Sequence, residues 1–301
     1  MDSGNIGFVL ICAAFVFVMT PGLAMFYGGL VRKKNVVNTM MTSIFIIGIG
    51  IVMWVLFGYS LSFAPSGNAF IGDFRWLGLE GVSLTEGYTD DASIPNMVFS
   101  AFQMMFAVIT PALITGAVAG RMKFKSIFVF TIFWSLIVYY PLAHMVWGQG
   151  GLLGADGIGA LDFAGGDVVH ISSGVSALVL CILLGKRHDY EHSIYRIHNI
   201  PTVVLGASLL MFGWFGFNAG SALAADGLAA HAFMTTGVSA AAAMLSWMLC
   251  DVIKNKKPTL IGASTGMVAG LVGITPGAGF VPMWAAVIIG LTTSPVCYIM
   301  I

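Results

Sequence analysis

The sequence predicts an all-α polytopic membrane protein. Of its 301 residues, 58% are hydrophobic and only 9% are charged, whereas about a quarter of the residues in a soluble domain carry charge. Long apolar runs recur along the whole chain, and the short loops between them alternate in their content of basic residues. The outer surface of the folded chain is therefore expected to face lipid.

Nine apolar runs are long enough to cross a hydrocarbon core of about 30 Å as helices. They cover residues 5–29, 38–62, 96–119, 126–147, 169–185, 200–218, 228–253, 259–275 and 280–301. The loops between them are short and rich in charge, Gly, Pro or Asn, except for a long acidic loop at about 63–95. Residues 1–301 are thus expected to form a single transmembrane domain.

The basic residues predict how the spans are oriented. Twelve of the 13 Lys and Arg residues lie in the first, third, fifth and seventh loops. These are Arg32, Lys33 and Lys34; Arg121, Lys123 and Lys125; Lys186, Arg187 and Arg196; and Lys254, Lys256 and Lys257. Cytoplasmic loops carry such an excess, so we expect the odd loops and Ile301 on the cytoplasmic side and the N-terminus outside. Most acidic residues lie on the outer side, and Asp189, Glu191 and Asp251 lie on the inner side.

Several function classes have no support in the sequence. The net charge of zero lacks the basic field of a nucleic-acid-binding protein. No metal-ligand spacing, glycine-rich phosphate loop or Ser/His/Asp arrangement is visible, so neither an enzyme nor a cofactor or metal site is expected. The four cysteines are interpreted as apolar core residues: Cys12, Cys181, Cys250 and Cys297. Three histidines in the fifth loop are interpreted as solvated surface residues: His188, His192 and His198.

Aromatic residues gather at the predicted outer ends of spans. Trp147 ends the fourth span, where an indole either belongs to the interfacial belt or holds a cation against its face. Phe102 and Phe106 are four residues apart and so share one face of the third span, as packing residues or as a pore lining. Ser221 follows the sixth span and offers a hydroxyl oxygen as an acceptor.

Two polar residues mark the fifth span. Asp162 precedes two glycines at its outer end, where a carboxylate caps a helix or contacts a ligand. His170 lies deeper, either as a hydrogen-bonded core residue or as a group that accepts or relays a proton. Together with the aromatic residues, they suggest an outer cation vestibule, an aromatic constriction and then a histidine, an arrangement that suits ammonium or neutral ammonia.

Four ordered segments resemble the ammonium transporter family along nearly the whole chain. They are TPGLAMFYGGLVRKKN at 20–35, AHMVWG at 143–148, LDFAGGDVVH at 161–170 and GWFGFNAGS at 213–221. The resemblance implies that Trp147, Phe102 and Ser221 recruit ammonium, supported by Asp162. It further implies that Phe106 and Phe217 form a gate of stacked rings. Trp214, Tyr139 and His170 would line the pore, with His170 as the first of two pore histidines.

The resemblance also implies a fold of two inverted five-helix halves plus a final helix, assembled as a homotrimer in the plasma or inner membrane. Here the halves would be about 1–187, with five spans, and about 198–301, with four. The family's last two helices, its second pore histidine and its regulatory docking tail are expected to be absent. The implied function is transport of ammonium or ammonia, and the alternative is an ammonium sensor or a non-conducting truncated subunit.

Overall fold

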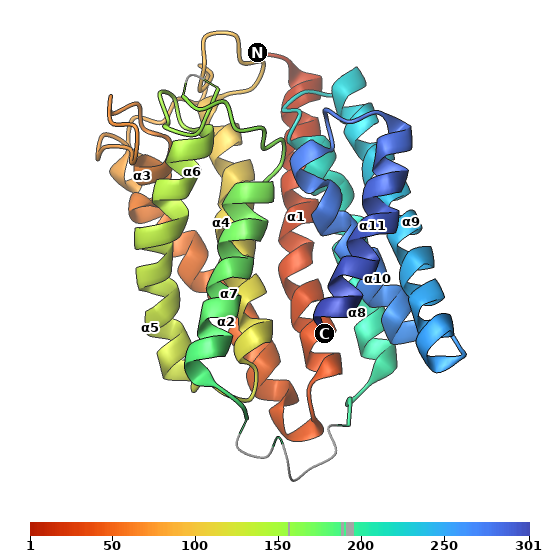
Figure 1. Ribbon diagram of the computed structural model, residues 1–301. Coiled ribbons are helices and arrows are strands. Elements are labelled where there is room, and N and C mark those ends of the chain that lie inside the picture. Colours follow the sequence, from red (N-terminus) through yellow and green to blue (C-terminus); the bar gives the residue numbers. More distant parts are fainter. Residues whose placement is uncertain (156, 188–189, 191–195) are drawn as a thin grey trace.

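The computed structural model describes residues 1–155, 157–187, 190 and 196–301 of the chain. Within these residues, nine helical segments are long and apolar enough to cross a membrane, which confirms the nine predicted spans. They run side by side as one bundle (Figure 1). The inner-loop residues His188, Asp189, Glu191 and His192, which the sequence interpretation used, lie outside the described residues.

The spans are built from continuous and interrupted helices. Span 1 is α1 (Ser3–Leu30), and span 2 joins η1 (Lys33–Asn35), α2 (Val36–Met53), η2 (Trp54–Gly58) and α3 (Tyr59–Phe63). Span 3 is α4 (Asn96–Val118), and span 4 joins α5 (Phe124–Trp134), η4 (Ser135–Tyr139) and α6 (Tyr140–Trp147). Span 5 joins η5 (Gly166–Ile171) and α7 (Ser172–Leu184). The next four comprise α8 (Ile200–Gly220); α9 (Gly227–Asn255); α10 (Leu260–Ile274) with η6 (Thr275–Gly277); and α11 (Met283–Met300). A short turn, η3 (Leu77–Leu79), lies in the long loop. The segments η2, η4 and η5 are π-helical turns within their spans.

Four spans begin at side chains that cap a helix. Asp2, Asn199, Asp226 and Thr259 each accept a hydrogen bond from the backbone N–H three residues further on. The first turn of a helix has N–H groups without intrahelical partners, and these side-chain oxygens satisfy one of them. The caps place the starts of α1, α8, α9 and α10.

Helices α1 and α8 form the seam between the first five spans and the last four (Figure 1). A Cβ atom added at Gly206 would lie 2.3 Å from the backbone nitrogen of Phe26, and one at Gly22 would lie 2.8 Å from the Cβ of Leu209. Only hydrogen fits at these positions. The small residues therefore let the two backbones approach closely, which is the usual way in which membrane helices associate.

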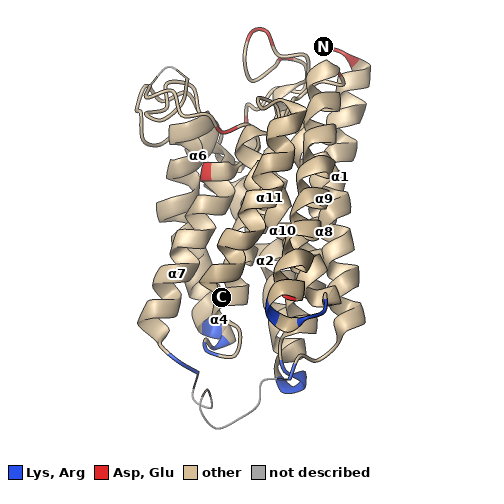
Figure 2. Ribbon diagram, turned by 45° about the vertical axis from the view of Figure 1, so that its right-hand side comes forward, with Lys and Arg blue, Asp and Glu red and all other residues tan. Residues whose placement is uncertain are grey.

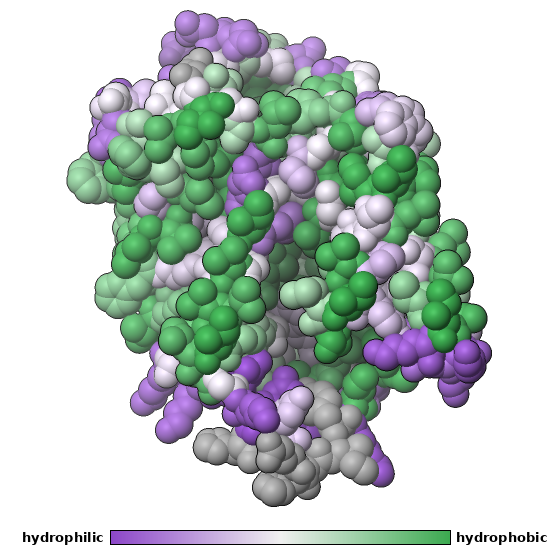
Figure 3. Space-filling view, viewed as in Figure 1, coloured by the Kyte–Doolittle hydropathy of each residue, from purple (hydrophilic) through white to green (hydrophobic). Residues whose placement is uncertain are grey.

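The surface of the bundle separates by charge and by hydropathy. Lys and Arg residues gather at the end opposite the N-terminus, where the odd loops lie (Figure 2). Apolar side chains cover the flanks, and the face bearing α7 and α11 is hollowed between them (Figure 3). These two spans are the least buried of the nine.

Candidate functional site

A cavity of about 440 Å³ lies at the N-terminal end of the bundle. We call it the vestibule. Its wall combines the start of α4, the C-terminal ends of spans 4 and 6, and the loop that precedes α4. The lining residues are Tyr88, Thr89, Asp91, Ala92, Ser93, Ile94, Phe99, Phe102, Gln103, Phe106, Trp147, Asp162, Phe163, Ser221, Ala222, Leu223 and Ala224. Five of the residues singled out from the sequence therefore meet in one cavity: Phe102, Phe106, Trp147, Asp162 and Ser221.

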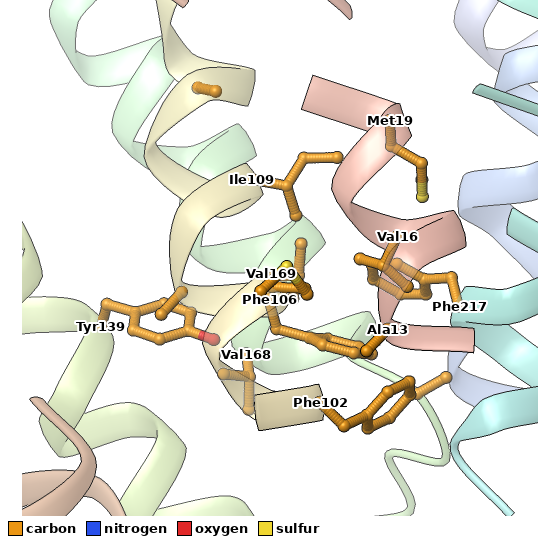
Figure 4. Packing of buried hydrophobic residues seen from close by; sticks show 14 of the residues in the cluster. Ala13, Val16, Met19, Phe102, Phe106, Ile109, Tyr139, Val168, Val169 and Phe217 are labelled. Atoms are coloured by element: carbon orange, nitrogen blue, oxygen red, sulfur yellow. The ribbon is translucent and has the colours of Figure 1, made fainter. Parts of the chain in front are cut away.

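Aromatic rings form the floor of the vestibule. The Phe106 ring lies 4.9 Å from the Phe102 ring, 6.0 Å from the Trp147 ring and 4.2 Å from the Phe217 ring, measured between centroids. Phe106 and Phe217 are each 1% exposed, and Phe217 lies behind Phe106 without lining the vestibule. Figure 4 shows the Phe102, Phe106 and Phe217 rings gathered between α4 and α1. The contact between Phe106 and Phe217 closes the floor of the vestibule.

His170 lies on the far side of the Phe217 ring. Its ring centroid is 6.0 Å from that of Phe217 and 5.3 Å from that of Trp214, with both pairs stacked. Nε2 of His170 is buried and has no hydrogen-bond partner among the described residues. Trp214 is held in place because its Nε1 donates to the Thr275 hydroxyl at 2.9 Å. The vestibule, the ring pair and His170 thus follow one another along one line of contacting side chains.

The Asp162 side chain caps the fifth span. Its Oδ1 accepts from the backbone N–H groups of Gly165 and Gly166, both at 2.6 Å, and its Oδ2 accepts from those of Asp167 and Val168 at 2.8 and 3.2 Å. Gly165 has φ +120°, a conformation that favours glycine. The backbone carbonyl of Asp162 accepts from Trp147 Nε1 at 3.1 Å. Asp162 therefore fixes both the start of the span and the indole above the rings.

Two oxygens at the vestibule are available as acceptors. The Ser221 hydroxyl donates to the Phe217 carbonyl at 2.8 Å, which leaves lone pairs on its oxygen. Oε1 of Gln103 is buried and has no partner among the described residues. Sequence reasoning missed Gln103, although a polar side chain within a membrane span is itself a signal of function.

Further residues hold the walls of the vestibule. The Tyr88 ring stacks on that of Phe99 at 4.7 Å, and its hydroxyl accepts from the Gln149 backbone N–H. Burial raises the pKa of Tyr88 to about 12, so its phenol is neutral at physiological pH. His144 lies one turn before Trp147, is fully buried, and places its ring nitrogens 3.1 and 2.8 Å from the carbonyl oxygens of Ser62 and Asn68.

Tyr139 lies apart from the line that runs from the vestibule to His170. Its ring packs against Trp134 and Tyr140, with centroids 6.3 and 5.9 Å away, and it does not line the vestibule. In Figure 4 its hydroxyl points from the fourth span toward Val168. Within the described residues, Tyr139 belongs to the packing around the site.

Nine spans among the described residues, an aromatic vestibule with unfilled acceptors and a histidine behind a closed ring pair define a polytopic membrane protein built to handle a small cation. Residues 7–301 match the Ammonium Transporter Family. The chain belongs to this family, and hence to a family of transporters rather than of enzymes.

The chain is also similar to individual proteins, in sequence and in structure. The chain is 52% identical over 298 residues to the ammonium transporter of Bacillus subtilis, covering 99% of this chain and 72% of that protein. The crystal structure of Saccharomyces cerevisiae Mep2 is similar with a TM-score of 0.90 and 38% identity, covering 99% of this chain and 66% of that one. A structure described as a sensor Amt protein gives a TM-score of 0.88 and 29% identity over 99% of this chain and 74% of that one. The chain therefore spans about two thirds to three quarters of the length of these proteins.

Proposed function

We propose that this chain transports ammonium or ammonia across the plasma or inner membrane. The observation that carries the proposal is the line of contacts from Trp147 and Phe106 through Phe217 to His170. Ring faces suited to a cation lie on one side of the Phe106–Phe217 pair, and a histidine lies on the other. Relatives named ammonium transporters support the choice of substrate.

The geometry suggests an order of events. Ammonium is recruited at the rings of Trp147, Phe102 and Phe106, where each cation–π contact is worth about 0.5–2 kcal/mol, with Ser221 as an oxygen acceptor and Asp162 holding the indole in position. The Phe106–Phe217 pair has no room for a hydrated ion. The cation therefore loses a proton near this pair, and neutral ammonia passes Trp214 and His170. The proton either returns to water in the vestibule or is carried in parallel past His170, whose buried ring can hold or relay it.

The proposal includes an orientation and an assembly. The vestibule lies at the end of the bundle opposite the basic loops, so it faces outward if those loops are cytoplasmic. The family resemblance implies a homotrimer with one pore in each subunit. The exposed apolar flanks of the bundle face lipid or neighbouring subunits in this arrangement.

Transport by the purified chain in liposomes tests the proposal. Ammonium-dependent current or uptake is expected, and Trp147→Ala and His170→Ala should each abolish most of it. Trp284→Ala is the matched control, because Trp284 is 67% exposed on α11 and should leave uptake unchanged. Uptake that survives both substitutions in the line of contacts would contradict the assigned roles.

A second candidate is an ammonium-binding sensor or a subunit that does not conduct. The similarity to a structure described as a sensor Amt protein and the closed contact between Phe106 and Phe217 favour it. Saturable ammonium binding to wild-type protein without any flux would support this function. Measurable ammonium flux through the chain would reject it.

A further inference from the structure

Gln103 places an unpaired amide oxygen at the wall of the vestibule. The residue follows Phe102 on α4, is 8% exposed, and lines the same cavity as Phe102, Phe106, Trp147 and Ser221. Its Oε1 has no hydrogen-bond partner among the described residues. A buried acceptor without a donor costs about 1–3 kcal/mol, and most buried polar atoms in native proteins have a partner.

Three other polar residues on the same wall do not donate to the Gln103 oxygen. The Ser221 hydroxyl donates to the carbonyl of Phe217 at 2.8 Å. The Trp147 indole donates to the carbonyl of Asp162 at 3.1 Å. The two oxygens of the Asp162 side chain accept from four backbone N–H groups and offer no hydrogen. None of these groups donates to the Gln103 oxygen, and a cation in the vestibule would supply the missing donor.

We infer that the Gln103 amide oxygen accepts an N–H bond of the bound cation and makes the vestibule selective for cations with several N–H groups. This inference rests on the proposed function, since it concerns the cation recruited at the same rings. Rotation of the terminal amide exchanges its oxygen and nitrogen in nearly the same space, so the oxygen can face a cation without repacking α4. A carboxamide is neutral and adds this acceptor without placing a fixed charge at the rings.

The selectivity follows from counting donors and acceptors. Ring faces attract any small cation, but oxygen acceptors reward only those with N–H groups. The vestibule offers two such oxygens, those of Ser221 and Gln103. Ammonium with four N–H bonds and methylammonium with three can fill both oxygens, whereas trimethylammonium has one N–H bond and fills only one.

Gln103→Met tests the inference, because methionine keeps the length of the side chain and removes the amide. Transport of ammonium and methylammonium is measured in liposomes, with trimethylammonium chloride as the competitor. The variant should raise KM for both substrates about tenfold, the loss expected for one hydrogen bond to a charged group, with Vmax within about twofold of wild type. The inhibition constant of trimethylammonium should change less than about twofold, because this cation can still use Ser221.

Asn255→Leu is the control, because it likewise replaces an amide by an apolar side chain of similar size. Asn255 is exposed at the basic end of α9 and does not line the vestibule, so this exchange should leave all three constants unchanged. Unchanged KM in Gln103→Met, or a loss of Vmax alone, would overturn the inference while transport by wild type still stands. An equal rise in the inhibition constant of trimethylammonium would also overturn the inference, because that rise would show damage to the ring faces. Absence of saturable transport in wild type would instead contradict the proposed function.

Discussion

At the scale of single residues, the site depends on polar groups that hold aromatic rings rather than on charges that touch the substrate. Asp162 anchors the start of the fifth span and the Trp147 indole, and Thr275 anchors the Trp214 indole beside His170. Cation–π attraction depends on how a ring faces the ion. Substitutions at these anchors should therefore disturb ring positions as well as stability.

Asp162→Asn should destabilise the protein strongly, because an amide NH₂ would face backbone N–H groups that now meet a carboxylate oxygen. We expect a loss of at least about 2 kcal/mol, since hydrogen bonds to a charged group contribute roughly 1.5–3 kcal/mol each. Asp226→Asn is the control: Asp226 is exposed and caps α9 through one bond, and asparagine caps equally well. Thermal unfolding in detergent measures the stability of both variants. Equal midpoints for the two variants would contradict this account of Asp162.

Thr275→Val should destabilise the region around His170. Valine has the shape of threonine but leaves the Nε1 donor of Trp214, which is 2% exposed, without a partner, at a cost of about 1–3 kcal/mol. Thr292→Val on α11 removes an exposed hydroxyl and should shift the unfolding midpoint far less. Tryptophan fluorescence and thermal unfolding of the purified variants check the difference, and a larger effect at Thr292 would refute it.

At the scale of elements, the α1–α8 seam depends on the absence of side chains. Gly206 and Gly22 lie where the two backbones come closest. In lipid, helices gain little from burying apolar surface against one another, so close packing through small residues holds them together. A single methyl group at this seam must push one half of the bundle away from the other.

Gly206→Ala is therefore expected to weaken the seam. Its Cβ would lie 2.3 Å from the backbone nitrogen of Phe26, and overpacking of this kind typically costs about 1–3 kcal/mol. At Gly174 on α7 a Cβ would meet nothing within 4 Å, so Gly174→Ala should leave stability unchanged or raise it by about 0.5–1 kcal/mol through helix propensity. Detergent unfolding of the pair tests the prediction; a stable Gly206→Ala with a destabilised Gly174→Ala would reverse it.

Apolar runs and charged loops predict every span in the described residues, because length and composition alone govern insertion in a bilayer. Local detail depends on packing and was not predictable. The fifth span begins at Gly166, earlier than the predicted residue 169, because the Asp162 cap organises a segment that looks like a loop. The π-helical turns η2, η4 and η5 carry no signature in hydropathy.

The candidate site was predictable only in part for the same reason. The aromatic residues of the vestibule stand out by type and by their place at span ends. Their contacts join residues far apart in sequence, such as Phe106 and Phe217, and no local pattern reports such a distance. Thr275 and His144 act through hydrogen bonds to partners at least 61 residues away in the sequence, so sequence reasoning assigned them no role.

At the scale of the whole molecule, charge is distributed along the axis of the bundle. The basic loops lie at one end, and most acidic residues lie toward the other, the end that holds the vestibule (Figure 2). Among the described residues at that end, Arg75 is the only Lys or Arg; it pairs with Asp73 at 2.7 Å and lowers the pKa of that carboxyl. Negative charge at the end that holds the vestibule attracts cations. The same distribution of basic residues predicts the orientation in the membrane.

The orientation can be tested by labelling. Single cysteines are placed at two exposed positions, Asp91→Cys beside the vestibule and Lys257→Cys at the basic end, in a background that lacks the four native cysteines. A maleimide that cannot cross membranes should label Asp91→Cys in intact cells and Lys257→Cys only after permeabilisation, because basic loops are retained in the cytoplasm. Labelling of Lys257→Cys in intact cells would place the vestibule on the cytoplasmic side, and the proposed direction of ammonium recruitment would then be reversed.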